Sequence, residues 1–474
     1  EPARAVLRQA GIATMDTPAA AAEAVSLLTR WSALRTRLDR VPLSSGEVAC
    51  DRAAAAEIIG HAAAEGRHLL TEPEAKAVLA AYAVPVPAPL VATTEEEAAR
   101  HAQTLLAGSP AVVVKLLSRR VSHKSDLGGV VLGLTSPAAA RDAARTVRER
   151  FLAAGYSNSD LDGFSVQPMV RRPAAEELLV GLHKDVIFGP VVMFGSGGIA
   201  VEVVRDTVTG LVPLDELFAG DLIDATRVSK LLAGYRDRPP ADRGAIVGVL
   251  LAVSQLAVDF PCIVAADVNP LLADGDGVVA LDARIEIDPA RASETGPSRE
   301  LPVRPYPAGW EREVSAAGVT YRVRPMRPAD AALYPDFLSR VTPDDLRMRF
   351  LAPTRTLSHE AIVRLSQLDY DRDIAFVALE PEGALAAVVR YSADPDHETA
   401  EYGALVRSDL QGRGLGTAMM RLLIDYARAN RLQELSGLVL RDNNDMLTLT
   451  GDLGFEQSTV DADPGLVRVT LALR

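Results

Sequence analysis

The spacing of apolar residues divides the chain into segments that repeat like helices and segments that repeat like strands. Met420, Leu423 and Ala427 recur at intervals of three and four, which predicts a helix over 417–430. Short apolar runs bounded by turn residues predict strands over 111–116, 177–182, 263–269, 374–379, 384–391 and 400–406. At 474 residues the chain is long enough for two to four domains that mix both element types.

The apolar segments are too short or too polar to cross a membrane. The longest, 245–260, contains Ser254, Gln255 and Asp259 and is therefore predicted to be a buried helix. We expect no signal peptide and no membrane partner. Residues 1–42 are predicted to form a helix, a short strand at 13–15 and a second helix, and 43–66 a polar connector that runs into a helix. Because the chain does not begin with Met, we expect it to be a fragment.

Charge and cysteine content narrow the class of protein. A net charge of −13 argues against a nucleic-acid partner. Cys50 and Cys262 form neither a disulfide framework nor a zinc spacing, which fits a reducing cytoplasm. The seven histidines do not cluster, so we expect no transition-metal site.

A glycine-rich turn precedes the predicted helix 417–430. Gly412, Gly414 and Gly416 let an anion approach the backbone closely, and the helix N-terminus that follows favours negative charge. The turn is therefore a candidate cradle for a pyrophosphate, although glycine turns between strands and helices are also common in proteins that bind nothing there.

Two further positions carry candidate chemistry. Lys115 lies near the end of a buried strand, where it is either a phosphate ligand or half of a buried ion pair. Asn269 and Asp282 follow apolar segments that could end side by side. Two oxygen donors brought together in this way suit Mg²⁺, which takes its remaining ligands from water and phosphates; the alternative is a turn-forming Asn-Pro and a surface Asp.

From about 67 to 288 the chain resembles the ATP-grasp half of the ADP-forming acyl-CoA synthetases. The resemblance is carried by the ordered segments 115–118, 122–129, 167–169, 188–190, 195–198, 267–270 and 282–284. It implies ATP and Mg²⁺ as ligands, with phosphate on Lys115, adenine framed by Gln167, Pro168 and Met169, phosphoryl transfer linked to His123, and Mg²⁺ on Asn269 and Asp282.

The same resemblance sets limits on what we expect of this half. Ala265 stands where that family usually has a Glu, which bears on turnover more than on binding. Residues 1–42 resemble the tail of a preceding CoA-ligase domain, so we expect this chain not to run the complete ligase reaction alone.

A Pro-, Ser- and Glu-rich linker is predicted over 289–318. The following segment, 319–474, resembles a GNAT acetyltransferase domain through its strand order, its Gln-x-x-Gly-x-Gly turn and the closing sequence 453–455. The fold class predicted for the whole chain is thus α/β and α+β, with an ATP-grasp domain followed by a GNAT domain. The implied acetyl-CoA contacts are Val406, Gln411, Gly412, Arg413, Gly414, Gly416, Thr417 and Asn443.

A GNAT enzyme needs a base, because a lysine ammonium is not a nucleophile at neutral pH. By resemblance Glu401 occupies the base position, acting directly or through water. Thr450 stands where many GNAT enzymes have a tyrosine that protonates the leaving thiolate.

The order of the two halves resembles the bacterial protein lysine acetyltransferases that modify acyl-CoA synthetases. We therefore expect acetyl transfer from acetyl-CoA to a protein lysine, with the ATP-grasp region as a ligand sensor. The alternatives are an ADP-forming ligase portion with an accessory GNAT domain, and a scaffold with degenerate sites. Small amines also remain as acceptors, and a homo-oligomer is compatible with the sequence.

Overall fold

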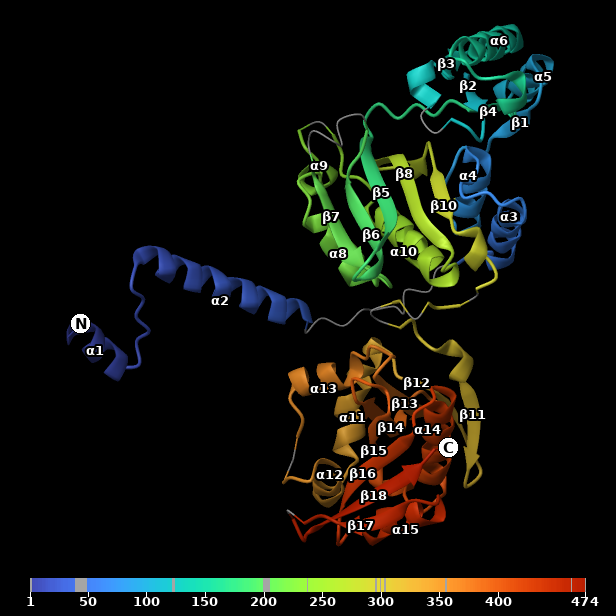
Figure 1. Cartoon of the computed structure of the whole chain (residues 1–474). Coiled ribbons are helices and arrows are strands. Elements are labelled where there is room, and N and C mark those ends of the chain that lie inside the picture. Colours follow the sequence, from blue (N-terminus) through green and yellow to red (C-terminus); the bar gives the residue numbers. More distant parts are fainter. Residues whose placement is uncertain are drawn as a thin grey trace. The chain divides into compact units, whose positions relative to one another are not determined.

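A computed structural model describes residues 2–38, 49–121, 124–198, 205–236, 238–294, 296–298, 300–301, 304–353, 356–461 and 463–473. The chain divides into two compact units, residues 46–305 and residues 306–474, the second grouped with residues 1–45. Figure 1 shows the two units with the chain coloured along its sequence.

The N-terminal segment contains two helices, α1 (Pro2–Gln9) and α2 (Pro18–Leu38). The strand expected at 13–15 is wrong, because these residues have no regular structure. Of the predicted connector 43–66, residues 43–48 lie outside the described residues, and its second part forms helix α3 (Arg52–Ala64).

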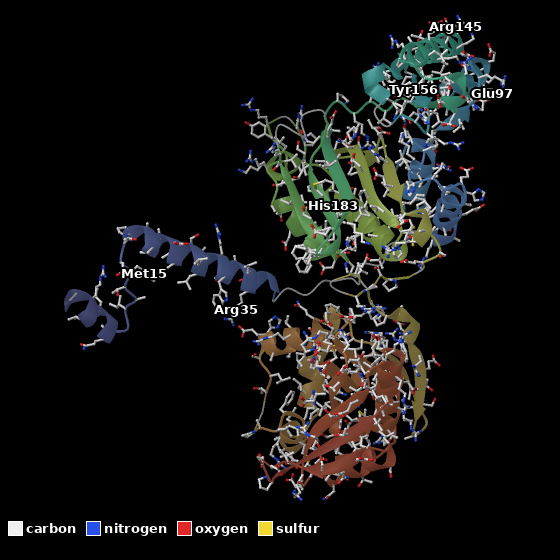
Figure 2. The ribbon with its side chains drawn as sticks, viewed as in Figure 1. Met15, Arg35, Glu97, Arg145, Tyr156 and His183 are labelled. Carbon is white, nitrogen blue, oxygen red and sulfur yellow. The ribbon has the colours of Figure 1, made fainter. Side chains whose placement is uncertain are left out.

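The smaller sheet of the unit 46–305 is antiparallel, with the strand order β1-β4-β2-β3. Its strands are β1 (Leu90–Ala92), β2 (Val112–Leu117), β3 (Val130–Leu134) and β4 (Gly163–Pro168). Helices α5 (Glu95–Leu106) and α6 (Pro137–Ala153) contribute buried alanines to the core beneath them. Thr94 and Ser136 cap these helices by accepting backbone hydrogen bonds, as expected for such residues at a helix start. Figure 2 labels Glu97 on α5 and Arg145 on α6.

The larger sheet of this unit has the order β10-β8-β5-β6-β7, with β9 also paired to β8. Its strands are β5 (Glu176–Asp185), β6 (Gly189–Ser196), β7 (Thr207–Leu211), β8 (Ile263–Asp274), β9 (Gly277–Ala280) and β10 (Arg284–Ile287). Helix α10 (Arg243–Asp259) packs against the sheet and is buried along most of its length, as its apolar sequence predicted (Figure 1). The remaining elements are α4 (Glu72–Ala81), α8 (Glu216–Asp224), α9 (Ser229–Leu232), η1 (Lys124–Leu127), η2 (Asn158–Asp160) and η3 (Pro289–Arg291).

Strand β8 corrects one expectation. The apolar run 263–269 was expected to end as a strand near Pro270, but pairing with β9 continues the strand to Asp274. The tertiary partner, which is invisible in a local pattern, extends the element.

The unit 306–474 is built on one sheet with the order β11-β12-β13-β14-β15-β16-β18-β17. Its strands are β11 (Arg312–Ala316), β12 (Val319–Pro325), β13 (Asp373–Leu379), β14 (Leu385–Ala393), β15 (Thr399–Val406), β16 (Glu434–Leu440), β17 (Glu456–Thr459) and β18 (Leu466–Ala472). Its helices are η4 (Ala308–Trp310), η5 (Pro328–Leu333), α11 (Tyr334–Ser339), α12 (Pro343–Phe350), α13 (His359–Ser366), η6 (Ser408–Leu410), α14 (Leu415–Ala429) and α15 (Asn444–Asp452).

The segment predicted as a linker, 289–318, is not a plain spacer. Leu301 is buried in the core of the unit 46–305, and Lys184 forms an ion pair with Glu300 at 2.6 Å. Strand β11 pairs along its length with β12 and so belongs to the C-terminal sheet. Because its proline-rich composition is typical of a spacer, the sequence predicted neither these contacts nor strand β11.

Candidate functional sites

Strands β15 and β16 separate after a short stretch of parallel pairing. Strand β15 pairs with β14 from Ala400 to Val406, whereas its pairing with β16 covers only Thr399–Glu401. Strand β16 continues to pair with β18 on its other side. Beyond Glu401 the facing backbone groups of these two described strands therefore need partners other than each other, such as a ligand or water.

A cavity of about 660 Å³ lies along these separated edges. Its walls include residues 402–406 of β15, Leu438 and Val439 of β16, and residues from α12, α14 and α15. Seven of the residues predicted to contact acetyl-CoA line it: Val406, Gln411, Gly412, Gly414, Gly416, Thr417 and Asn443. The fold thus brings most of that predicted set to one place.

The glycine turn has the backbone geometry that its sequence suggested. Gly412 and Gly414 adopt φ angles of +70° and +84°, which residues with a side chain rarely adopt. Gly414 is the N-cap of α14 and provides no capping side chain, so N–H groups of the first turn have no intrahelical partner. Together with the positive end of the helix dipole, these groups can accommodate an anion.

Three predicted residues differ from a simple lining role. Arg413 is exposed and is not among the lining residues described. Asn443 lines the cavity, but its Oδ1 also accepts a hydrogen bond from the Met446 N–H at 3.1 Å and so caps α15. Glu401 is exposed and is not itself a lining residue; it lies where β15 and β16 part, one position before the lining residue Tyr402. Its role as a base stays a prediction.

Thr450 is fully buried and is not among the lining residues described for the acetyltransferase cavity. Its hydroxyl donates to the backbone carbonyl oxygens of Met446 at 2.8 Å and Leu447 at 3.1 Å. Tyr402, in contrast, has a buried hydroxyl without a hydrogen-bond partner among the described residues, and burial raises its pKa. The Tyr402 hydroxyl therefore stays protonated and remains available as a donor.

Helix α12 supplies lining residues that the sequence reasoning missed, namely Asp345, Met348 and Arg349. Burial acts to raise the pKa of Asp345, but hydrogen bonds from Ser408 and Thr342 outweigh it and hold the pKa below its ordinary value. A signal for this helix was present, because Thr342 caps it and Pro343 follows at its first position.

The unit 46–305 has a second cavity, of about 310 Å³. Lys115, Asn269 and Asp282 all line it, so the structure brings together the predicted phosphate ligand and the two predicted Mg²⁺ ligands. Pairing of β8 with β9 brings Asn269 and Asp282 together. Leu271 lies opposite Ala280, and the Leu281 N–H donates to the Pro270 carbonyl at 3.0 Å.

Lys115 belongs to a cluster of three lysines around one carboxylate. Glu72 lies 2.6 Å from Lys115 Nζ, 2.9 Å from Lys76 Nζ and 2.5 Å from Lys124 Nζ. Lys76 is fully buried, and burial lowers its pKa to about 8 despite the attraction of Glu72. The ion-pair alternative for Lys115 is therefore realised, yet three ammonium groups share one carboxylate and leave positive charge beside the cavity.

The metal-binding prediction has suitable donors. The Asn269 side-chain oxygen accepts from the Gly198 N–H at 3.0 Å, and Asp282 Oδ1 lies 3.8 Å from Lys115 Nζ. Burial raises the pKa of Asp282, and the Glu72 carboxylate raises it further. A divalent cation would relieve that repulsion, and an amide and a carboxylate oxygen are donors it accepts. No group of three His, Cys, Asp or Glu side chains that could hold a metal occurs in the described ranges.

The residues predicted to contact adenine do not line this second cavity. Gln167 is buried and accepts a hydrogen bond from Lys76 Nζ at 2.6 Å, which links it to the lysine cluster. Gln167, Pro168 and Met169 are not among the described lining residues, and His123 lies outside the described residues. Glu72 and Lys76 were not predicted, although their spacing of four on one helix is a recognisable ion-pair signal.

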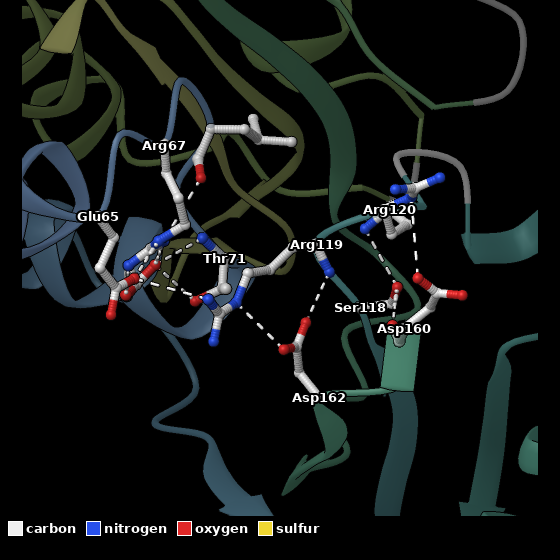
Figure 3. A network of polar contacts seen from close by, with 10 residues as sticks. Glu65, Arg67, Thr71, Ser118, Arg119, Arg120, Asp160 and Asp162 are labelled. Atoms are coloured by element: carbon white, nitrogen blue, oxygen red, sulfur yellow. Dashed lines mark hydrogen bonds and ion pairs between the residues drawn. The ribbon is translucent and has the colours of Figure 1, made fainter. Parts of the chain in front are cut away.

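Polar contacts hold the rim of this second cavity, as Figure 3 shows. The Ser118 hydroxyl donates to the Asp160 carbonyl at 2.7 Å, and the Arg119 N–H donates to the Asp162 carboxylate at 2.7 Å. Thr71 donates through both its N–H and its hydroxyl to Glu74, a capping-box contact at the start of α4. The lining residues Ser118, Arg119 and Thr71 are thereby fixed in position.

None of the described helices has both the length and the apolar character needed to cross a membrane.

Comparison with known proteins identifies both parts. Residues 61–287 match the ATP-grasp domain family, and residues 344–455 match the acetyltransferase (GNAT) family. The β subunit of the ADP-forming acetate–CoA ligase I of Pyrococcus furiosus is 39% identical over 237 residues, covering 50% of this chain and 99% of that subunit.

An acetyltransferase of Pseudomonas aeruginosa is 33% identical over 136 residues, covering 28% of this chain and 73% of that protein. A solved acetyl-coenzyme A synthetase of Candidatus Korarchaeum cryptofilum, in complex with coenzyme A, is 35% identical, covers 49% of this chain and 99% of its own, and has a TM-score of 0.46. The predicted order of an ATP-grasp domain followed by a GNAT domain is confirmed. The chain belongs both to the ATP-grasp family that includes the ADP-forming acetate–CoA ligase β subunits and, through its C-terminal domain, to the GNAT acetyltransferase family.

Proposed function

We propose that this chain transfers an acetyl group from acetyl-CoA to a lysine amine of another protein, with acyl-CoA synthetases as the expected acceptors. The observation that carries the proposal is the cavity between β15 and β16. It has a helix N-terminus with a glycine turn among its walls, and Glu401 stands where the two strands part. That arrangement offers a place for a pyrophosphate and, further along β15, a carboxylate for an amine.

In this proposal the chain contributes three things. The backbone N–H groups of residues 411–417 hold the pyrophosphate, and the edge of β15 that β16 leaves unpaired beyond Glu401 pairs with the amides of the pantetheine arm. Glu401 takes the proton from the lysine ammonium, which lets the nitrogen attack the thioester carbon. When the C–S bond breaks, the electron pair goes to sulfur, and coenzyme A leaves as the thiolate.

The test uses labelled acetyl-CoA, the whole chain and a purified acyl-CoA synthetase. We expect label on a synthetase lysine with the wild-type chain and at least a hundredfold slower labelling with Glu401→Gln, since general-base catalysis contributes roughly 10²–10⁴-fold. Glu398→Gln, an exposed glutamate just before β15, is the matched control and should keep the wild-type rate. Equal rates for the wild type and Glu401→Gln would remove the base role. Absence of label on the synthetase while acetyl-CoA still binds would assign a different acceptor.

For the ATP-grasp region we propose a ligand-sensing role with ATP and Mg²⁺ as the ligands. Its support is the cavity where Lys115, Asn269 and Asp282 meet beside the lysine cluster. Binding of ATP should change the acetylation rate, and Lys115→Met should weaken that binding and abolish the change. If neither ATP nor an acyl-CoA binds residues 67–288 or alters the rate, the sensing role fails.

The second candidate is a ligase half-reaction with an accessory GNAT domain. The same cavity favours it, because a phosphate ligand and two oxygen donors for a cation stand together there. Transfer of the γ-phosphate of labelled ATP to His123, lost in His123→Asn, would support the ligase reading. A chain that binds ATP without such transfer would support the sensor.

A further inference from the structure

Helix α12 runs beside the acetyltransferase cavity from its glycine-turn end toward its Glu401 end. At the start of the helix, the Thr342 N–H donates to Ser408 Oγ at 2.9 Å, and Asp345 accepts a hydrogen bond from the same hydroxyl. Near its end, Arg349 lies against Gly403 of β15. Arg349 therefore stands three residues along the strand from Val406, roughly 10 Å at strand spacing, and away from the glycine turn.

Gly403 is what allows the guanidinium to lie there. A Cβ atom at Gly403 would stand 2.2, 2.4 and 2.8 Å from Nη2, Cζ and Nη1 of Arg349, distances that real Cβ contacts essentially never show. Because side chains alternate along a strand, Glu401 and Gly403 face the same side of the sheet. The Arg349 guanidinium thus lies on the face of β15 that carries the proposed base.

Two neighbouring arginines have carboxylate partners, whereas Arg349 has none among the residues that the structure describes. Arg347 lies 3.0 Å from Asp344, and Arg390 lies 3.1 Å from Asp373. Among the described residues no carboxylate lies within 4.0 Å of the Arg349 guanidinium and no hydrogen bond from it is found; its recorded contact is the Phe350 ring, at 5.2 Å.

Burial lowers the pKa of Arg349, and the Arg390 guanidinium lowers it further, while Glu401 acts in the opposite direction. An arginine stays charged in a protein, so this half-buried cation stands in the cavity wall without an anion.

The charges of the lining residues show where an anion fits. The other charged residues in the described lining, Asp345, Asp445 and Asp452, are acidic and would repel a carboxylate. The phosphates of acetyl-CoA have the glycine turn, at the other end of α12, as their site. The negative group that pairs with Arg349 therefore belongs to the acetyl acceptor and not to acetyl-CoA.

We propose that Arg349 binds a carboxylate of the acceptor, held next to the amine that is acetylated, so that the enzyme selects lysines flanked by an acidic residue. The inference rests on the proposed function. Glu401 and Arg349 present a negative and then a positive group on one face of β15, which complements an ammonium beside a carboxylate. The planar guanidinium suits a carboxylate because it can donate two parallel hydrogen bonds.

Two synthetic peptides test the proposal, identical except for Glu or Gln beside a single lysine, with the whole chain and acetyl-CoA. A hydrogen bond to a charged group is worth about 1.5–3 kcal/mol, so we expect kcat/KM to favour the Glu peptide by roughly 10–100-fold. Arg349→Gln should bring the two peptides within about twofold, mainly by losing rate on the Glu peptide. Gly403→Ala should do the same while keeping the charge, because it displaces the guanidinium.

Arg347→Gln is the matched control. It removes the same charge from the same helix, at a half-buried residue outside the lining set, and should keep the preference. Unchanged circular dichroism and acetyl-CoA affinity will show that the variants are folded.

Four results would count against the assignment. Equal use of the two peptides by the wild type contradicts Arg349 while leaving lysine acetylation intact. Equal loss on both peptides in Arg349→Gln would instead make it a positioning residue for Glu401. Free lysine accepted as well as the Glu peptide would place the carboxylate on a small acceptor, and acetylation of neither peptide would reject the lysine-acceptor function itself.

Discussion

Replacing Glu72 by Gln removes the carboxylate on which Lys76, Lys115 and Lys124 converge. Glu72 is 5% exposed and its three nitrogen partners lie within 2.9 Å, so the variant removes the carboxylate that all three ammonium groups share, while Asp282 stays 3.8 Å from Lys115 Nζ. Breaking a buried ion pair by removing one partner costs about 3–5 kcal/mol of stability, because the remaining charge is uncompensated. We expect a loss of that size for the unit 46–305.

The assay must report on that unit alone. Both tryptophans, Trp31 and Trp310, lie outside residues 46–305, so tryptophan fluorescence does not follow its unfolding. Hydrogen exchange of strands β2 and β5, measured in increasing urea, follows the unfolding of this unit. Glu57→Gln, at an exposed position on α3 of the same unit, is the control and should change stability by less than about 0.5 kcal/mol.

A ligand provides an independent check on the cause of the loss. Inorganic triphosphate should stabilise the Glu72→Gln variant more than the wild type, because it supplies the missing negative charge to the same lysines. If the variant is as stable as the wild type, or if triphosphate protects both equally, the three lysines do not share Glu72 as their counter-ion and the reasoning is refuted.

Three further outcomes are expected. Gly416→Val should weaken acetyl-CoA binding at least tenfold by calorimetry. A Cβ there would be in van der Waals contact with Val406 at 3.4 Å, so the two further methyl groups of Val would enter the cavity; unchanged affinity would contradict the position of the cradle. The pKa of Lys76 is lowered to about 8 by folding from 10.5, so the unfolded state binds more protons between these values. The stability of its unit should therefore rise from pH 8 to 10.5, by up to about 3 kcal/mol, and Lys76→Met should flatten this rise in pH-dependent urea melts. Arg324→Met should destabilise the C-terminal unit by about 3–5 kcal/mol in hydrogen exchange, since the buried Asp330 loses the two hydrogen bonds of 2.7 Å that it accepts from Arg324 and keeps the one from the Arg327 N–H. A loss below about 1 kcal/mol would count against that pair.

Elements with a dense local signal were predicted correctly. The strand expected at 111–116 is β2, the helix expected at 417–430 is α14, and the three strands expected between 374 and 406 are β13, β14 and β15. Helix α14 buries one face, whereas β2 and β13 are buried on both faces and have almost continuous apolar sequences. Neighbouring residues alone determine these patterns.

Elements that depend on distant partners were missed or misjudged. The short helix α12 has a start signal at Thr342 and Pro343 but no regular apolar face. Strand β11 lies in a proline-rich segment where only pairing with β12 makes it a strand. The strand expected at 13–15 has no such partner and does not form. Local propensity is weak in short segments, and tertiary pairing decides their state.

The two cavities also combine features that local sequence determines with features that depend on distant residues. The sequence by itself determined the glycine turn and the helix that follows it, since positive φ angles and a helix start are local properties of residues 411–417. Only the tertiary structure decided that Lys115 shares Glu72 with two other lysines, and that Arg349 lies against Gly403 without a carboxylate partner among the described residues. Apart from the Glu72–Lys76 pair within α4, those contacts join residues more than forty positions apart. These residues interact only because folding brings them within a few ångströms in a region from which water is largely excluded.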